Sequence, residues 1–377
     1  MAPLTQLNSA ALRPRRILVI ALQFLGDVLL STPLLHSLKL TYPEAQLDVL
    51  VYANTSPILA GNPDIAQIIT TPNRPKWVDY RQLIPRIFRS YDLALGLQTG
   101  DRPFLYSLLA APFRVSVVPP KNTTGWWKRY LVQCWLEHDD RGMHTVLQHL
   151  KLIDLINGRR SFALVPPQAD DAQLLKARFP FLAEAGSYVV LHPHPQWTYK
   201  RWTVEGWVAI ARYLSQLGYK IILSGSAAEA ELAYIDAIVQ QLPVTVLNLA
   251  GQVSLAQLAF VLGRAKFFIG PDTGVTHLAA ATGVPVIALY GPTNPVKWAP
   301  WPKDYQQSAN PFGSIGDQHV SNVYLCQGQA DCVPCHLEGC DRHRQSRSRC
   351  LESLTADRVK AIIDQLLNHD AMPVSGE

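Results

Sequence analysis

The sequence predicts an α/β fold of two domains, each built on a parallel sheet. Short apolar strands alternate with helical patterns along most of the chain, and this alternation is typical of βαβ units. The 377 residues are enough for two domains with full cores. A Gly-Pro-Asp-Thr-Gly turn at residues 270–274 joins an apolar strand to a helix. Ligands commonly bind at such turns in α/β sheets.

The first domain is expected over residues 17–170, after a polar arm, 1–16, that contains proline and arginine. Continuous apolar runs predict its strands, because parallel strands are buried on both faces. These strands are expected at Ile17–Leu22, Leu47–Tyr52, Ile65–Thr70 and Leu93–Leu97. A polar, proline-containing stretch, 158–180, predicts the linker to the second domain.

The second domain is expected over residues 180–350, with the same alternation of strands and helices. Its first strands are expected at Tyr188–Pro193, Tyr219–Gly225, Val244–Leu247 and Lys266–Ile269. The two domains therefore read as Rossmann-like halves, with a ligand in the cleft at the carboxyl ends of the strands. A last amphipathic helix, 351–370, is expected to pack back on the first domain.

Bulk composition is that of a soluble globular protein, with 48% hydrophobic and 17% charged residues. The formal charge of +5 permits contact with an anionic membrane or an acidic substrate but does not require either. The first apolar run is interrupted by Gln23, Gly26 and Asp27 and is too short to span a bilayer. With no visible signal peptide, we expect a cytoplasmic protein.

The turn after residue 270 has the features of an anion site. Asp272 and Thr273 can cap the helix that follows, and Gly274 lets a ligand approach the main chain. A helix N-terminus presents N–H groups and the positive end of a dipole. His277 lies one turn into the helix and can face the same ligand. The segment is therefore predicted to bind a diphosphate.

Three blocks of sequence, Arg16–Leu34, Asp272–Ala280 and Tyr290–Pro300, together resemble glycosyltransferase family 9, the ADP-heptose:lipopolysaccharide heptosyltransferases. The resemblance extends over about residues 15–365 and is weakest between 100 and 180. It implies a GT-B fold, in which two Rossmann-like domains face a central cleft. The first domain would bind the acceptor and the second the nucleotide sugar. It further implies inverting, metal-independent transfer that needs no cofactor.

Two catalytic residues follow from the resemblance. Asp27 would be the base that takes a proton from the acceptor hydroxyl; the alternative is an N-cap for the next helix. Lys200 would neutralise charge on the departing diphosphate. Because Arg201 separates Lys200 from Trp202, either cation fits this role, and a solvated basic loop is the simpler alternative.

The resemblance also supplies the donor-binding residues. Those that match the family's motif are Asp272, Thr273, Gly274 and His277. Further candidates at neighbouring strand ends are Ser224, Gly225, Glu229, Leu249 and Ala250. Glu229 is the nearest acidic residue for the ribose, since Ala227 and Ala228 stand where relatives often carry one. Leu249 and Ala250 form either a wall for the adenine or an ordinary strand end.

Basic and aromatic residues of the first domain suggest an acceptor site. The basic candidates are Arg102, Lys121, Lys128 and Arg129. They flank Trp126, Trp127 and Tyr130, and such a combination suits the phosphorylated, acidic core of lipopolysaccharide. The alternatives are an exposed amphipathic loop or a contact of the tryptophans with the inner-membrane surface.

Four cysteines form a possible metal site near the C-terminal end: Cys332, Cys335, Cys340 and Cys350. The first two have metal-knuckle spacing. A structural metal is one interpretation, and free thiols in a reduced loop are the other. Cys134 stands alone and is expected in the core. Without an Asp-x-Asp pair, a metal-bridged diphosphate has no evident ligands, and no nucleic acid partner is expected.

The leading hypothesis is therefore transfer of heptose from ADP-heptose to an inner-core lipopolysaccharide acceptor. A rival of the same fold uses another nucleotide sugar or a protein acceptor. A rival of another class is a non-catalytic, membrane-associated binding protein. The intact Asp27 and the intact Asp272–His277 turn argue against the last hypothesis.

Overall fold

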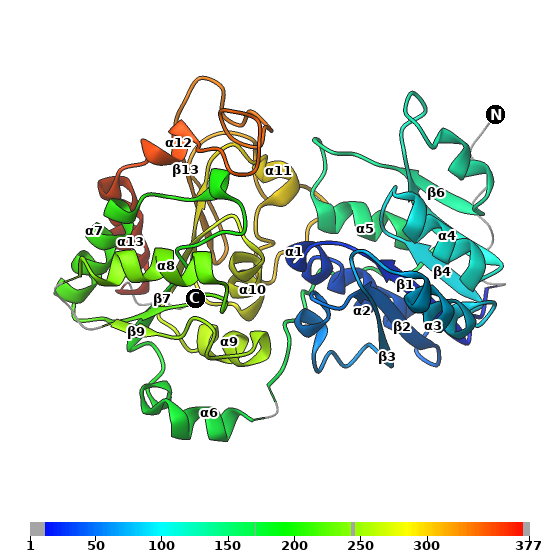
Figure 1. Ribbon diagram of the computed structural model, residues 1–377, viewed down its shortest axis with the longest axis horizontal. Coiled ribbons are helices and arrows are strands. Elements are labelled where there is room, and N and C mark those ends of the chain that lie inside the picture. Colours follow the sequence, from blue (N-terminus) through cyan, green and yellow to red (C-terminus); the bar gives the residue numbers. More distant parts are fainter. Residues whose placement is uncertain (1–11, 170, 243–245, 372–377) are drawn as a thin grey trace, which may run out of the picture. The chain divides into compact units, whose positions relative to one another are not determined.

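The chain forms two compact α/β units in a computed structural model (Figure 1). The described residues are 12–169, 171–242 and 246–371, so residues 1–11 of the predicted arm lie outside them. The first unit comprises Met1–Gln168 and Asp304–Asn310; the second comprises Ala169–Lys303 and Pro311–Glu377. The chain thus returns to the first unit at Asp304–Asn310, and no pattern in the sequence predicts this return. Each unit carries one sheet with helices packed against it, so the predicted fold class is confirmed.

The first unit contains a six-stranded parallel sheet in the order β3-β2-β1-β4-β5-β6. Its strands are β1 (Arg16–Ala21), β2 (Gln46–Tyr52), β3 (Gln67–Thr71), β4 (Leu93–Gly96), β5 (Phe113–Val118) and β6 (Cys134–Glu137). Its α-helices are α1 (Leu25–Leu29), α2 (Thr32–Thr41), α3 (Trp77–Ile87), α4 (Asp101–Ala110) and α5 (Thr145–Asp154). Short 3₁₀ helices are η2 (Ser56–Leu59) and η3 (Trp126–Tyr130). The first four strands were predicted; β5 and β6 were not.

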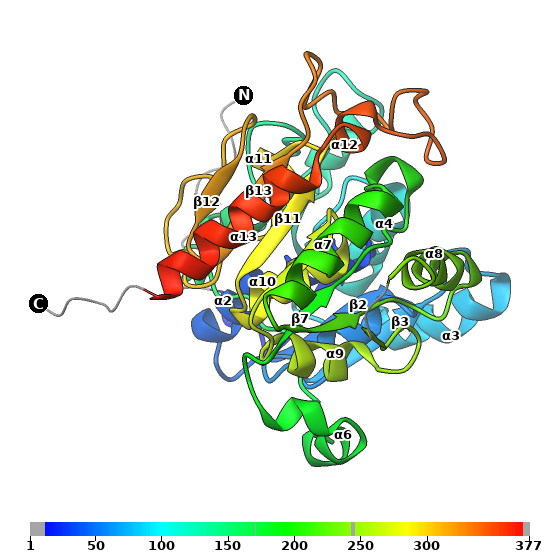
Figure 2. The same cartoon turned by 90° about the vertical axis from the view of Figure 1, so that its left-hand side faces the viewer.

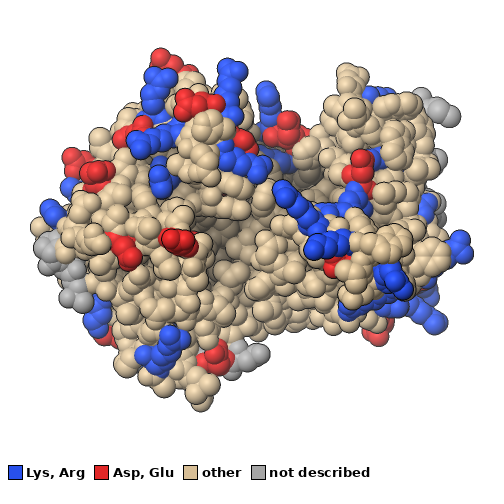
Figure 3. Space-filling view, in the orientation of Figure 1, with Lys and Arg blue, Asp and Glu red and all other residues tan. Residues whose placement is uncertain are grey.

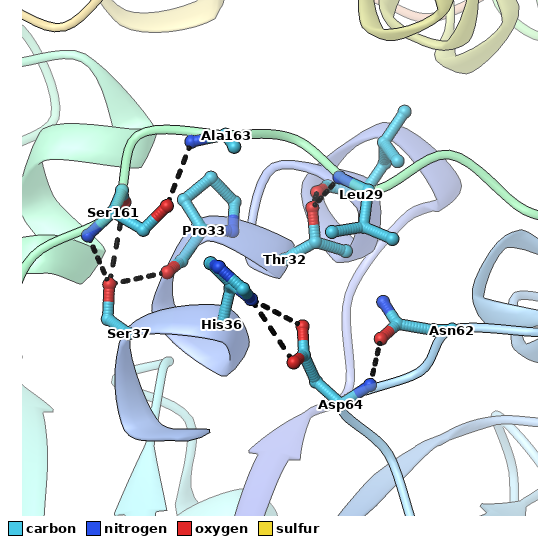
Figure 4. Close-up of polar contacts among 10 residues, drawn as sticks. Leu29, Thr32, Pro33, His36, Ser37, Asn62, Asp64, Ser161 and Ala163 are labelled. Carbon is cyan, nitrogen blue, oxygen red and sulfur yellow. Dashed lines mark hydrogen bonds and ion pairs between the residues drawn. The ribbon is translucent and has the colours of Figure 1, made fainter. Parts of the chain in front are cut away.

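Polar side chains fasten α2 to two neighbouring segments of the first unit (Figure 4). The Ser37 hydroxyl accepts a hydrogen bond from the Ser161 main-chain N–H at 2.8 Å. The Thr32 hydroxyl accepts one from the Val165 N–H at 3.0 Å. Nδ1 of His36 lies 3.1 Å from both carboxylate oxygens of Asp64. The chain that leaves the first unit therefore runs along α2, held by side chains of that helix.

The second unit contains a seven-stranded sheet in the order β12-β13-β11-β10-β7-β8-β9, parallel except for β12. Its strands are β7 (Tyr188–Leu191), β8 (Lys220–Leu223), β9 (Val246–Asn248), β10 (Phe268–Pro271), β11 (Val286–Tyr290), β12 (Gln318–Val320) and β13 (Val323–Gln327). Its α-helices are α6 (Ala172–Arg178), α7 (Val204–Gln216), α8 (Glu229–Val239), α9 (Leu255–Leu262), α10 (Gly274–Thr282), α11 (Pro295–Trp298), α12 (Arg349–Glu352) and α13 (Ala356–Ala371). Short 3₁₀ helices are η4 (Pro180–Ala183) and η5 (Thr198–Lys200).

The C-terminal helix α13 belongs to the second unit. It lies beside α7 and contacts β11 and β13 (Figure 2). Its apolar side chains Val359, Ile363 and Leu366 are buried in the same core as Trp202 and Trp207. The expectation that this helix returns to the first domain is therefore corrected, because its apolar face is already buried within the second unit. No helix of the described chain is long and apolar enough to span a membrane.

Candidate active site

Three polar residues and a glycine follow four neighbouring parallel strands of the second unit, where each strand ends. His192 follows β7, Ser224 follows β8, Asp272 follows β10 and Gly291 follows β11. Since these strands are parallel and adjacent in the sheet, their carboxyl ends lie at one edge. The predicted donor residues are thus brought to a single edge of a single unit.

The turn between β10 and α10 is built as a capped helix start. Thr273 is the N-cap, and its hydroxyl accepts a hydrogen bond from the Thr276 N–H at 3.3 Å. The Thr276 hydroxyl in turn donates to the Pro271 carbonyl oxygen, which ties the helix to the end of the strand. Gly274 is the first residue of the nine-residue helix. Because Thr273 supplies the cap, the side chain of Asp272 is not needed for capping and points elsewhere.

Asp272 pairs with Lys200. The Lys200 Nζ lies 2.6 Å from the Asp272 carboxylate, which is almost fully buried. Burial alone would raise the pKa of Asp272, but the Lys200 ammonium, His277 and the Thr293 hydroxyl together lower it below its ordinary value. The pair is therefore ionised at neutral pH. It places a cation next to the N-terminus of α10.

Arg201 lies apart from this pair. Its guanidinium stacks over the Tyr234 ring at 4.7 Å from the ring centre. Tyr234 belongs to α8, and its hydroxyl donates to the Trp202 carbonyl oxygen. Of the two adjacent cations, Lys200 is thus the one next to Asp272.

His277 is buried beside the Lys200–Asp272 pair and is held neutral. Burial lowers its pKa to about 4, an effect that Lys200 reinforces and Asp272 opposes. Its Nδ1 is buried and has no hydrogen-bond partner among the described residues. An unpaired buried nitrogen is costly, so a ligand atom that bonds it would be favoured.

The end of β8 brings together Ser224, Gly225 and an acidic residue that sequence reasoning missed. Glu231 is 9% exposed and accepts a hydrogen bond from the Ser226 hydroxyl. A side chain at position 225 would come within 2.9 Å of the Glu231 carboxylate, so glycine permits this close approach. Glu229, the predicted candidate, is exposed in the first turn of α8. Helical spacing could have predicted this position, because the third residue of α8 points toward the edge of the sheet.

His192, which directly follows β7, is a second residue that sequence reasoning left without a role. Its Nδ1 lies 3.1 Å from the Ser224 hydroxyl, and burial lowers its pKa. At the next strand end, Leu249 and Ala250 are both buried. The Leu249 N–H donates to the Leu223 carbonyl oxygen at 2.8 Å. Leu249 thus continues the β8–β9 pairing beyond the end of β9, and Ala250 lies between this bond and the next, from the Gly251 N–H to the Gly225 carbonyl oxygen.

Asp27 lies in the first unit, in the first turn of α1, after β1. It is half-buried. The N-cap of α1 is Phe24, three residues earlier. The structural alternative for Asp27, an N-cap, therefore does not apply.

The four basic residues expected to bind the acceptor lie in different settings. Lys128 and Arg129 are buried, and each is bonded to a main-chain oxygen, Lys128 to Thr99 and Arg129 to Pro119. Lys128 also pairs with Asp101 at 2.6 Å and Arg129 with Glu137 at 3.5 Å. Arg102 donates to the Tyr52 hydroxyl and stacks over the Tyr52 ring. Lys121 is exposed. The structure thus uses Lys128 and Arg129 to hold the connection between β5 and β6.

The cysteines do not form a metal centre in the described part of the chain. Among residues 12–169, 171–242 and 246–371, no three His, Cys, Asp or Glu side chains are arranged to hold a metal ion. Cys332 and Cys340 are exposed, Cys335 is half-buried and Cys350 is buried. The four-thiolate site suggested by the sequence is therefore not supported, although Cys332, Cys335 and Cys340 lie close enough to Cys350 to contribute to its raised pKa, which is mainly due to burial. Cys134 is buried, as predicted for a core residue.

This fold and site define the class of protein. The family model "Glycosyltransferase family 9 (heptosyltransferase)" matches residues 86–326, about two thirds of the chain. The chain therefore belongs to glycosyltransferase family 9 and is a glycosyltransferase with the GT-B fold.

Particular relatives can be named. The chain is 30% identical over 294 residues to Lipopolysaccharide heptosyltransferase 3 of Escherichia coli, covering 74% of this chain and 84% of that protein. Among solved structures it is similar to E. coli ADP-heptose lps heptosyltransferase II, with a TM-score of 0.72, 22% identity and coverage of 95% and 100%. It is also similar to E. coli heptosyltransferase WaaC with ADP, with a TM-score of 0.69, 19% identity and coverage of 93% and 99%.

Proposed function

We propose that this enzyme transfers heptose from ADP-heptose to an inner-core lipopolysaccharide acceptor, with inversion and without a metal ion, at the cytoplasmic face of the inner membrane. The observation that carries the proposal is the Lys200–Asp272 pair at the start of α10, next to the unpaired Nδ1 of His277. The similarity to a lipopolysaccharide heptosyltransferase at 30% identity supports the choice of sugar and acceptor.

The donor diphosphate is proposed to lie at the N-terminus of α10. The helix offers main-chain N–H groups and the positive end of its dipole, and Thr273 and Gly274 form its first positions. Lys200 would balance the negative charge that develops on the leaving diphosphate. Neutral His277 can donate a hydrogen bond to a phosphate or sugar oxygen. Asp272 would hold Lys200 in position rather than contact the donor.

The nucleoside is proposed to lie along the ends of β8 and β9. Ser224 and Gly225 would line its approach, and Leu249 and Ala250 would contact the adenine. A carboxylate is a suitable acceptor for two ribose hydroxyls. Glu231, which lies against Gly225, is better placed for this contact than the exposed Glu229.

Asp27 is proposed to remove the proton from the acceptor hydroxyl as this attacks the anomeric carbon. The ADP then leaves with its bonding electron pair, and Asp27 keeps the proton until solvent removes it. Arg102 and Lys121 would bind acidic groups of the acceptor. Lys128 and Arg129 would bind the acceptor only if it replaced the Thr99 and Pro119 carbonyl oxygens as their hydrogen-bond partners. Another nucleotide sugar or a protein acceptor is the remaining alternative.

The test is a transfer assay. Purified protein is mixed with ADP-heptose and truncated inner-core lipopolysaccharide, and mass spectrometry measures the heptose mass shift and free ADP. We expect the shift, and we expect Asp27→Ala to lower turnover by about a thousandfold while ADP binding is kept.

Bound ADP-heptose without a mass shift would contradict the acceptor assignment and favour a protein acceptor. Absence of both binding and shift would contradict the donor assignment. Unchanged turnover in Asp27→Ala would remove Asp27 as the base. The rival binding protein predicts ADP-heptose binding with no turnover on any acceptor.

A further inference from the structure

The outer face of α3 in the first unit combines exposed aromatic and basic side chains. Trp77 is 75% exposed, and Val78 and Phe88 are also exposed. Arg81 and Arg86 are exposed on the same helix. Helical spacing puts Trp77, Val78, Arg81 and Phe88 within about a third of a turn of one another. Large apolar side chains rarely gather on a face that contacts only water.

The opposite face of α3 anchors the helix to the unit. Leu83 and Ile87 are buried in the core of the first unit, and Tyr80 packs against that core. The helix is thus fixed, and its outer face is presented by a stable part of the fold rather than by a loose segment.

The charge of this face has one sign. We define the α3 face as Arg74, Lys76, Trp77, Val78, Arg81, Arg86, Phe88 and Arg89. Its five cations are accompanied by one carboxylate within residues 74–89, that of Asp79. The Asp79 carboxylate accepts a hydrogen bond from the Lys76 N–H at 2.6 Å and serves as a helix cap. Neither Arg81 nor Arg86 has an ion-pair partner among the residues that the structure describes.

The same concentration is visible on the molecular surface. Lys and Arg side chains gather over the part of the first unit where Figure 1 draws α3, with few acidic side chains between them (Figure 3). A basic face of this kind attracts an extended anionic surface.

We propose that the α3 face is the surface by which this enzyme docks on an anionic lipid bilayer. Trp77 and Phe88 would enter the headgroup region, where amphipathic rings are favoured. The arginines and Lys76 would lie against the lipid phosphates, which attract basic residues near the membrane surface. A bilayer is favoured over a protein partner, because its anionic surface complements the cations while its headgroup region accepts the exposed aromatic side chains of the same helix.

The tryptophans of η3 are a poorer candidate for this contact. Trp127 packs edge-on against Phe104 with ring centres 5.7 Å apart, and Trp126 packs against Tyr130 at 5.8 Å. The neighbouring cations Lys128 and Arg129 are buried. This segment therefore offers aromatic surface without the exposed charge that α3 adds.

The inference deepens the proposed function, because a lipid-linked acceptor would lie at the surface on which α3 docks. It does not need that function to be correct. Binding to vesicles measures docking alone, and turnover of a soluble, truncated acceptor measures transfer alone. Failure of one leaves the other standing.

The test is co-sedimentation of the full chain with vesicles of phosphatidylethanolamine and phosphatidylglycerol, compared with neutral phosphatidylcholine vesicles. We expect binding to the anionic vesicles that weakens as salt is raised. The double variant Arg81→Glu/Arg86→Glu should bind at least about 30-fold more weakly, since each basic residue near such a surface contributes about 1 kcal/mol, or about fivefold. Trp77→Ser should weaken binding without changing its salt dependence.

The matched control is Lys151→Glu/Lys220→Glu, which makes the same change in net charge at exposed positions on other elements, α5 and β8. We expect it to bind like the parent chain, and Trp126→Ser to do the same. Circular dichroism confirms that each variant is folded. The proposal is overturned if the parent does not bind anionic vesicles, if it binds neutral vesicles equally well, or if the control loses as much binding as the α3 variant.

Discussion

The two units share a parallel-sheet architecture, but they use their charged residues differently. In the second unit, Lys200 is paired with a buried carboxylate at the carboxyl edge of the sheet, beside a helix N-terminus. In the first unit, Lys128 and Arg129 are buried and bonded to main-chain oxygens of nearby loops, and each also pairs with a more exposed carboxylate, that of Asp101 or Glu137. Both sets look alike in sequence, as basic residues next to aromatics. Both lysines lie near a helix start that follows a strand, but the carboxylate partner of Lys200 is buried, whereas Asp101, the partner of Lys128, is exposed. The comparison shows that the sequence around a cation does not reveal its partner or how deeply that partner is buried.

Replacement of Lys200 should give the largest effect. Lys200→Met is expected to lower turnover by about a hundredfold to a thousandfold, because the leaving diphosphate loses a fixed positive charge. Arg201→Met is the matched control, since its guanidinium stacks on Tyr234 instead. It should change turnover by less than about tenfold. Steady-state kinetics with ADP-heptose measures both. Equal losses would show that both cations serve the donor.

The same variant should lose stability in a pH-dependent way. Lys200→Met leaves Asp272 buried without its partner, which costs about 3–5 kcal/mol at neutral pH. The folded-state pKa of Asp272 is lowered in the parent chain, so the pair stabilises the fold above the ordinary Asp value and loses this effect in acid. The difference in unfolding free energy between parent and variant should therefore narrow as the pH falls below about 4. A constant difference in urea titrations across pH would contradict the ion pair.

His277 should produce a stability change in a different pH window. Its folded-state pKa of about 4 lies below its ordinary 6.5, so its contribution is complete above pH 6.5 and is lost as the pH falls toward 4. In the parent chain, the free energy of unfolding should therefore fall as the pH is lowered from 6.5 to 4. His277→Gln should make this fall smaller by up to about 3 kcal/mol. The substitution should not abolish the pH dependence of the unfolding free energy, because the pKa values of His192 and His194 are also lowered by burial. Urea denaturation at several pH values measures this pH dependence, and an unchanged dependence would show that the folded-state pKa of His277 is not lowered.

Loss of a buried cation in the first unit should lower stability without changing the use of the acceptor. Lys128→Met is expected to cost about 2 kcal/mol of stability, because the Thr99 carbonyl oxygen loses its donor and Asp101 loses its ion-pair partner. Lys121→Ala, at an exposed position, should cost less than about 0.5 kcal/mol. Thermal unfolding gives both values, and the acceptor KM should rise only in Lys121→Ala. A raised acceptor KM in a stable Lys128→Met variant would return Lys128 to the acceptor site.

The smallest expected effect distinguishes two neighbouring carboxylates. Glu231→Gln should weaken ADP binding by about tenfold, because a hydrogen bond to a charged group is lost. Glu229→Gln should leave it unchanged, since Glu229 is exposed in the first turn of α8. Isothermal titration with ADP compares the two. A larger loss of ADP affinity in Glu229→Gln than in Glu231→Gln would instead favour Glu229 as the ribose contact.

The sequence by itself determined the alternation of strands and helices and the capped turn before α10. Both depend on local chemistry: apolar runs specify buried strands, and Thr273 caps its own helix through the N–H of Thr276. β5 was harder to predict, because Arg114 and Ser116 interrupt its apolar run. β6 is only four residues long, too short for its pattern to stand out.

Only the tertiary structure decided where the charged side chains point. It pairs Lys200 with Asp272, seventy-two positions later, and turns Arg201 onto Tyr234. It buries Lys128 against Thr99 and brings Glu231 to Gly225. It also assigns α13 to the second unit through a core shared with α7. The direction of a side chain depends on the elements packed around it, and those elements come from parts of the chain that no local pattern connects.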